Sequence, residues 1–132
     1  MSTNTKSSSN KNKKTINDTS FDSPLYRTII KAIEDKKGEN IVALDLRNIE
    51  EAVASFFIIC DVQSKIQASA IVHNIIQEVL DNVDEKPYRS EEGTAWTLVD
   101  YVNIVVHVFQ TEERKFYDLE GIWMDAIRTE YN

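Results

Sequence analysis

The sequence predicts an α/β fold in which helices flank a mixed β-sheet. Three segments carry apolar residues at helical spacing, and four other segments are short apolar runs typical of strands. Their order along the chain is helix, strand, strand, helix, strand, strand, helix, which favours one sheet with helices packed on it. The chain has 132 residues, of which 42% are hydrophobic. This is enough for one packed domain.

The first predicted helix begins at Ser23-Pro24. Serine is a favoured N-cap, and proline loses no hydrogen bond at the first helical position. Lys36 and Lys37 are expected in a basic last turn, with Gly38 following as the C′ glycine. One face of the helix is predicted to be buried through four large residues, Tyr26, Ile29, Ile30 and Ile33.

Two strands and a long helix are predicted next. The first strand is 41–46 (IVALDL), and 55–60 (SFFIIC) is apolar on both faces, which is typical of an interior strand. Between them, Asn48 is expected to cap a short helical turn through 51–54. The long helix, 64–80, carries one apolar stripe made of Ala68, Ile71, Val72, Ile75, Ile76 and Val79.

The last part of the sequence predicts a hairpin and a final helix. After a polar loop at 90–93, residues 95–101 and 103–109 are separated too briefly for anything but an antiparallel hairpin. Residues 112–127 are predicted to be helical, in two pieces. One face of this helix is expected to hold Phe116, Leu119, Trp123 and Ile127.

Charge divides the chain into a leader and a domain. Residues 1–20 carry four lysines against one aspartate and are poor in apolar residues, so they are predicted to be a disordered basic leader. Residues 21–132, the predicted domain, carry 11 basic and 21 acidic residues. A domain with a net charge of −10 is repelled by phosphate backbones. A basic protein is therefore the expected partner, without direct binding to DNA.

Location can also be predicted from the sequence. No stretch reaches the ~18 consecutive apolar residues of a membrane span, and the first twenty residues lack the apolar region of a secretory signal. A single cysteine, Cys60, cannot form an internal disulfide. These features predict a cytoplasmic protein that does not bind membranes.

The residues that could carry catalysis lack the patterns that catalysis needs. Cys60, His107 and Asp100 are the types of a thiol triad, but no basic neighbour activates the thiol, and a small core residue is the preferred interpretation. His73 and His107 are the two imidazoles, and neither HxxxH nor CxxC is present to bind zinc. No metal site is predicted.

Nucleotide chemistry is disfavoured for a similar reason. The three glycines lie far apart, so neither a P-loop nor GxGxxG is formed. Asp45 and Asp61 each stand alone, whereas metal-dependent nucleotidyl transfer needs paired carboxylates. We expect no enzyme activity and no cofactor.

Aromatic residues are concentrated near the C-terminal end. Phe109, Phe116 and Trp123 are expected in the core. Trp96, Leu98 and Asp100 alternate along one strand face, an arrangement typical of a protein interface with an acidic rim. For Trp96 the pattern alone fits a core residue and a surface anchor equally well.

The segments GTAWTLVDYVNIVVHVF and RKFYDLEGIW resemble the hallmark of the Iojap family of ribosomal silencing factors. KKGENIVALDLR and SFFIIC are similar to the first two strands of that family, so the resemblance covers about residues 24–127. It implies a mixed sheet of about five strands, related to the nucleotidyltransferase fold without its catalytic carboxylates. It also implies a homodimer.

The function that this resemblance implies is translational repression. Family members bind a large-subunit ribosomal protein, the fourteenth, at the subunit interface, and block joining of the small subunit under nutrient limitation. A large-subunit assembly factor using the same surface, or a relic nucleotidyltransferase, remain alternatives. The contact residues carry over to Trp96, Leu98, Asp100 and Tyr101, with weaker support for Asn103 and His107.

The sequence departs from the family pattern at three places. Val62 replaces a common glycine after the second strand, and Ile66 replaces an arginine that often opens the long helix. Val102-Asn103 replaces the usual Gly-Asp at the hairpin tip. The loss of that aspartate puts its contribution to the interface in doubt, although Asp100 remains.

Overall fold

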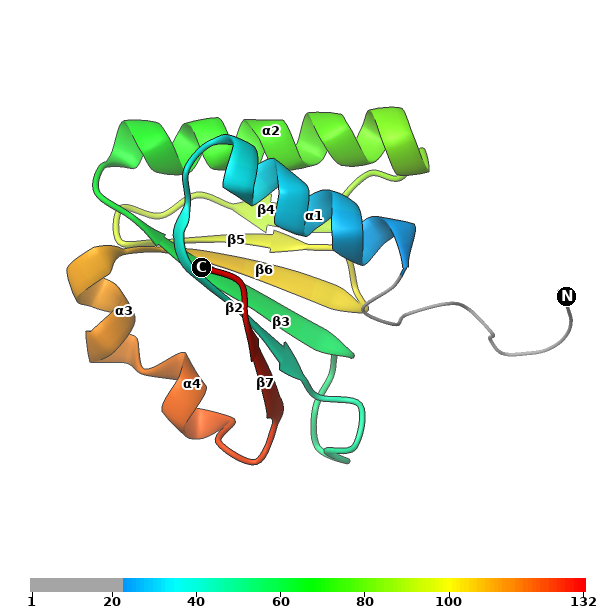
Figure 1. Cartoon of the computed structure of the whole chain (residues 1–132), viewed down its shortest axis with the longest axis vertical. Helices are drawn as coiled ribbons and strands as arrows, with labels where there is room; N and C mark the ends of the chain where they lie inside the picture. The colour runs from blue at the N-terminus through cyan, green and yellow to red at the C-terminus, as the bar shows by residue number, and fades with distance from the viewer. Residues whose placement is uncertain (1–22) are drawn as a thin grey trace, which may run out of the picture.

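The computed structural model describes residues 23–132, which form one sheet with helices on both faces (Figure 1). The predicted leader, residues 1–20, lies outside the described residues. The elements in chain order are α1 (Pro24–Asp35), β2 (Glu39–Asp45), β3 (Phe56–Val62), α2 (Lys65–Val83), β4 (Arg89–Glu91), β5 (Trp96–Asp100), β6 (Ile104–Gln110), α3 (Thr111–Tyr117), α4 (Leu119–Ile122) and β7 (Ile127–Glu130).

The sheet has six strands in the order β4-β5-β6-β3-β2-β7. The central pair β3 and β6 is parallel, and the other pairs are antiparallel. The prediction of a mixed α/β sheet is therefore confirmed, with one strand more than the five expected. Within the described residues no helix is long and apolar enough to cross a membrane.

The N-terminus of α1 is capped as predicted. The Ser23 hydroxyl accepts a hydrogen bond from the backbone N–H of Tyr26 at 3.2 Å. The prediction for the C-terminal end is wrong. Helix α1 ends at Asp35, and the residue that adopts a positive φ, of 64°, is Lys37 and not Gly38. Gly38 is needed for space instead, since a Cβ there would lie 2.4 Å from the side chain of Ile33.

The main core lies between the sheet and the two long helices. Figure 1 shows α1 and α2 side by side over one face of the sheet. The Tyr26 ring meets Phe56 edge-on at 5.1 Å, and the Tyr26 hydroxyl bonds that of Tyr131 at 2.5 Å. The fully buried aliphatic side chains of this layer include Ile29, Ile33, Ile41, Ile58, Ile71, Ile75 and Ile104.

The opposite face of the sheet carries a smaller apolar cluster, covered in part by α3 and α4 (Figure 1). The predicted single helical face is wrong here. Asp118 adopts a positive φ of 47° between α3 and α4, so the two helices do not share one phase. Phe116 is 79% exposed, whereas Phe109 is fully buried and Trp123 packs edge-on against Phe57 at 5.9 Å.

The remaining differences from prediction concern short segments. β4 overlaps the start of the expected polar loop, and Ile127, the last residue of the predicted final helix, is instead the first residue of β7. Both are exposed edge strands with charged residues, a common protection against pairing with other chains. Residues 51–54, predicted to form a helical turn, contain turns and bends only.

Candidate functional site

The hairpin of β5 and β6 carries most of the predicted contact residues. Trp96, Leu98 and Asp100 are half-buried and point to one face of the sheet, whereas Thr97 and Val99 between them are buried on the other. The face with Trp96 is the one that α1 and α2 leave uncovered. The structure therefore places three predicted contact residues in one row on an accessible face.

Trp96 is held in place by its neighbours on β6 and α3. Its indole lies 4.8 Å from the ring of Phe109 and 5.0 Å from that of Tyr117. The indole N–H donates to Nδ1 of His107 at 3.1 Å. The indole orientation is thus fixed by one hydrogen bond and two ring contacts.

His107 lies below this row and is only 3% exposed. Its ring packs edge-on against Phe57 at 4.5 Å. Burial lowers the pKa of His107 to about 4, and the charge of Asp100 opposes this shift. The histidine is therefore neutral at physiological pH. Because Nδ1 accepts from Trp96, the proton is assigned to Nε2, which is buried without a hydrogen-bond partner among residues 23–132.

A cleft of about 280 Å³ lies beside Trp96. Trp96 and Leu98 form its apolar side, and Glu91 and Glu92 form its acidic side. Gly93 allows the loop to approach closely, since a Cβ there would lie 2.6 Å from the carbonyl oxygen of Trp96. The cleft therefore combines an aromatic surface with two carboxylates.

The hairpin tip is a tight and strained turn. Val102 has a φ of 74°, and the Asn103 N–H donates to the Tyr101 carbonyl at 2.9 Å, which is the hydrogen bond of a γ-turn. Asp100 stabilises the turn by accepting the Val102 N–H at 2.7 Å. Asp100 also pairs with Arg89 at 3.4 Å. Asn103 is half-buried and lies at the hairpin tip, beyond the row formed by Trp96, Leu98 and Asp100.

Tyr101 lies away from the other predicted contact residues. It is 4% exposed and packs in the core below α1 and α2. Burial, with a smaller contribution from the charge of Glu85, raises the pKa of its hydroxyl to about 12. Of the six predicted residues, Tyr101 and His107 are therefore buried and reach a partner only through the residues that they support.

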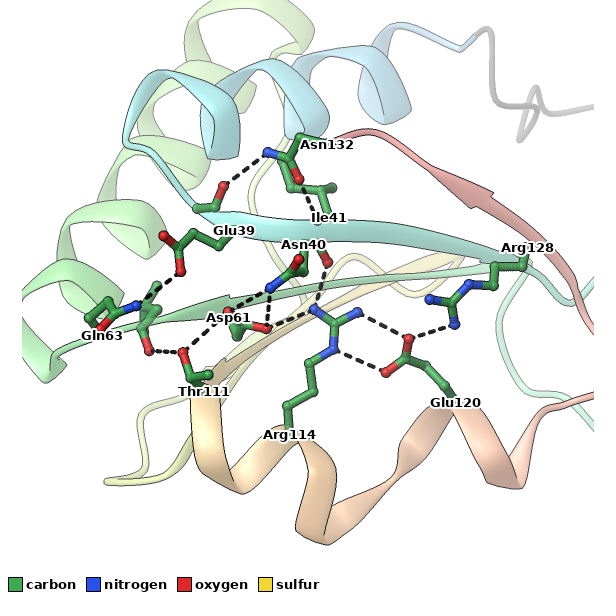
Figure 2. Close-up of polar contacts among 12 residues, drawn as sticks. Glu39, Asn40, Ile41, Asp61, Gln63, Thr111, Arg114, Glu120, Arg128 and Asn132 are labelled. Carbon is green, nitrogen blue, oxygen red and sulfur yellow. Dashed lines mark hydrogen bonds and ion pairs between the residues drawn. The ribbon is translucent and has the colours of Figure 1, made fainter.

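A buried ion-pair network, which is not among the predicted features, ties α3 to the sheet (Figure 2). Nη1 of Arg114 lies 3.1 Å from Oδ2 of Asp61 and donates to the Asn40 carbonyl at 2.6 Å. Arg114 also makes two hydrogen bonds to Glu120, of 3.0 and 3.1 Å. Asp61 and Arg114 are 3% and 8% exposed, so each requires the other's charge.

Arg128 lies beside Glu120 (Figure 2), and its Nη1 is 2.7 Å from Oε2 of Glu120. Burial alone raises the pKa of Glu120, but the hydrogen bonds and charges of Arg114 and Arg128 hold that pKa below its ordinary value. A polar cavity of about 430 Å³ lies alongside, with Lys115 and Asp118 among its walls. Its acidic and basic groups are largely paired with one another, which is typical of a structural tie.

The structure does not bring the residues of the candidate thiol triad together. Cys60 is fully buried in the core under α1 and α2, whereas His107 belongs to the opposite face of the sheet. Burial raises the pKa of the thiol to about 12, which suppresses the reactive thiolate. Among residues 23–132, no three His, Cys, Asp or Glu side chains are grouped to hold a metal ion.

Comparison with known proteins identifies the family. A family model described as "Ribosomal silencing factor during starvation" matches residues 18–132. This chain belongs to the ribosomal silencing factor family. The resemblance seen in the sequence is thereby confirmed.

Individual members of the family are similar over most of this chain. Ribosomal silencing factor RsfS of Halalkalibacterium halodurans is 36% identical over 107 residues, which cover 80% of this chain and 91% of that protein. The Bacillus subtilis protein of the same name is 40% identical over 96 residues, covering 72% and 80%. The chloroplastic protein Iojap of Zea mays is 31% identical over 108 residues, covering 78% of this chain and 45% of that protein.

Solved structures support the same fold. A Chromobacterium violaceum protein superposes with a TM-score of 0.69 at 30% identity, covering 75% of this chain and 82% of that one. A Bacillus halodurans protein superposes with a TM-score of 0.67 at 34% identity, covering 81% and 97%.

Within this silencing factor, two features of the site region were missed by sequence reasoning. The sequence did hold an indication of the Asp61–Arg114 pair, because a lone aspartate at the end of an apolar strand needs a buried counter-charge. Nothing in the sequence indicated the exposure of Phe116, since its helical spacing to Leu119 and Trp123 is typical of a core face.

Proposed function

We propose that this silencing factor is a cytoplasmic translational repressor that acts on the large ribosomal subunit. It binds a large-subunit ribosomal protein, the fourteenth, at the face where the subunits meet. Bound there, it sterically blocks joining of the small subunit when nutrients are limited. This specific role comes from the family resemblance, and the surface around Trp96 supports it.

The single observation that carries the proposal is the accessible row on β5. Trp96 and Leu98 present apolar area at the surface, and Asp100 and the carboxylates of Glu91 and Glu92 border it. Large apolar anchors surrounded by charged groups are typical of protein-binding surfaces. The hydrogen bond to His107 fixes the indole before binding, which reduces the entropy lost on association.

Charge favours a protein partner over bare RNA. Residues 23–132 carry 20 acidic and 11 basic side chains, a net charge of −9. Such a surface repels phosphates and attracts a basic protein. A basic ribosomal protein is therefore a better partner for this domain than the ribosomal RNA beside it.

Co-sedimentation with purified large subunits tests the proposal. We expect the parent to co-sediment and Trp96→Glu to lose most of its binding, because a carboxylate would replace the central apolar anchor. Ile66→Glu is the matched control. Ile66 is 83% exposed on α2, over the other face of the sheet, so this variant should bind like the parent. Equal binding by Trp96→Glu and the parent would show that the assigned surface is wrong.

A subunit-joining assay distinguishes silencing from the alternative role in assembly. A silencer added to mature subunits should lower the yield of joined ribosomes in proportion to the occupied large subunits. An assembly factor would leave joining unchanged, and its deletion would instead cause precursor particles to accumulate.

We further infer from the resemblance that the free protein is a homodimer. Sedimentation-velocity centrifugation of the pure protein tests this directly. A single species of monomer mass across the accessible concentration range would contradict it.

A further inference from the structure

Helix α3 presents two aromatic side chains to solvent beside the row on β5. Phe116 is 79% exposed and Tyr117 is 41% exposed. Their rings meet edge-on at 5.3 Å, and the Tyr117 ring lies 5.0 Å from the indole of Trp96. Trp96, Tyr117 and Phe116 therefore form one continuous aromatic row that crosses from the sheet onto the helix.

The exposure of Phe116 is enforced by the buried ion pair. Arg114 points inward to Asp61, and Phe116 follows it by two residues, which is about 200° around a helix. Phe116 must therefore point away from the sheet whenever Arg114 is paired. A rotation of α3 that buried Phe116 would therefore break the pair between Arg114 and Asp61. Exposed aromatic area held in this way is typical of an interaction surface.

Acidic groups border the aromatic row on both sides. Glu112 and Glu113 each precede one of the two aromatics by four residues and so lie on the same helix faces. Glu91 and Glu92 lie on the other side of Trp96. The Gln110 N–H donates to the Ala95 carbonyl at 3.0 Å, and this hydrogen bond holds the loop that follows Glu91 and Glu92 beside the start of α3. Lys115, in contrast, faces the polar cavity.

We propose that α3 extends the partner-binding surface, and that the row of Trp96, Tyr117 and Phe116 binds a lysine- or arginine-bearing segment of the protein partner. The inference rests on the proposed function and adds a second contact region to it. The aliphatic part of a basic side chain packs on aromatic rings, and its charged end pairs with the bordering carboxylates. A single-stranded nucleic acid also stacks on aromatics, but four carboxylates at this site repel its phosphates.

The first experiment removes one exposed ring and measures the dissociation constant for large subunits. We expect Phe116→Ala to weaken binding about tenfold, as for an aromatic residue central to an interface. Ile66→Ala, which truncates an equally exposed side chain on α2, should bind within about twofold of the parent. Both variants should keep the melting temperature of the parent, because neither side chain is buried.

The second experiment tests the chemistry of the partner. Glu112→Gln/Glu113→Gln should weaken binding several-fold and reduce its dependence on salt. Glu50→Gln/Glu51→Gln changes the net charge equally at an exposed site elsewhere, and should leave binding close to that of the parent. Tighter binding by Glu112→Gln/Glu113→Gln would indicate contact with RNA and overturn the proposal.

The outcomes separate the two proposals. If the parent binds, Trp96→Glu does not and Phe116→Ala binds like the parent, the contact through α3 is wrong and the proposed function stands. If the parent itself does not co-sediment with large subunits, the proposed function is wrong and the inference about α3 is overturned with it.

Discussion

Trp96 and His107 are joined by a hydrogen bond that runs diagonally across β5 and β6. In the strand register Trp96 faces Phe109 and Leu98 faces His107, so the indole N–H reaches back two residues to donate to Nδ1 at 3.1 Å. An imidazolium ring carries N–H donors on both nitrogens. Protonation of His107 and this hydrogen bond therefore exclude each other.

The first prediction concerns stability at acidic pH. The pKa of His107 is about 4 when folded, below its ordinary 6.5, so the unfolded chain binds more protons between these values. The contribution of His107 to stability is complete above pH 6.5 and is lost as pH falls towards 4. This loss is on the order of 3 kcal/mol. Urea unfolding of the parent at several pH values measures it.

The matched variant is His107→Gln, which keeps an acceptor near the indole but does not titrate. The free energy of unfolding of this variant should fall less than that of the parent between pH 6.5 and 4. The difference between the two curves isolates His107 from the carboxylates that titrate in the same range. Parallel curves would contradict the prediction.

The second prediction concerns the buried ion pair. Arg114→Met leaves Asp61 buried without its counter-charge, and should destabilise the fold by about 3–5 kcal/mol. Arg128→Met removes a half-exposed arginine from the same network and should cost no more than about 1 kcal/mol. Urea denaturation compares the two. Adding Asp61→Asn to Arg114→Met should cost less than the sum of the single changes, because the two residues interact directly.

The third prediction concerns the strained hairpin tip. A β-branched residue at a φ of 74° is unfavourable, so Val102→Gly should raise the free energy of unfolding by about 1 kcal/mol. Val53 is 88% exposed and has no positive φ, so Val53→Gly should give no such gain. Thermal unfolding measures both. Destabilisation by Val102→Gly would show that the valine side chain makes a stabilising contact.

The fourth prediction concerns the reactivity of Cys60. Burial raises the pKa of its thiol to about 12 from an ordinary 9.0, so almost no thiolate forms at mildly alkaline pH. We expect the native protein to resist alkylation by iodoacetamide, and the protein unfolded in guanidinium chloride to react fully. Mass spectrometry counts the alkyl groups. Rapid labelling of the native protein would mean that the core opens under β3.

The regular parts of this fold could be predicted because local signals agree with tertiary packing. Ser23 caps α1, as the sequence predicts, and the two apolar runs of the central sheet became β3 and β6. The family motif also drew attention to the hairpin with Trp96. The structure shows why those residues share one face, namely the simple alternation along β5.

Other parts depend on contacts that leave no local pattern. The strands β4 and β7 are exposed and mostly polar, so they exist only because β5 and β2 offer hydrogen-bonding edges. The left-handed conformation of Asp118 interrupts an otherwise continuous helical pattern, which is why Phe116 was wrongly expected in the core. Tyr101 was included through the family motif, although the alternation along β5 places it on the face of Thr97 and Val99, opposite Trp96.

The hydrogen bond between Trp96 and His107 also determines the thermodynamics of any contact at this site. With its N–H already occupied, the indole offers a partner only carbon and hydrogen atoms. Association through Trp96 should therefore remove apolar area from water without forming a new hydrogen bond to the indole. The expected calorimetric signature is a negative change in heat capacity, smaller for a variant in which Trp96 is truncated.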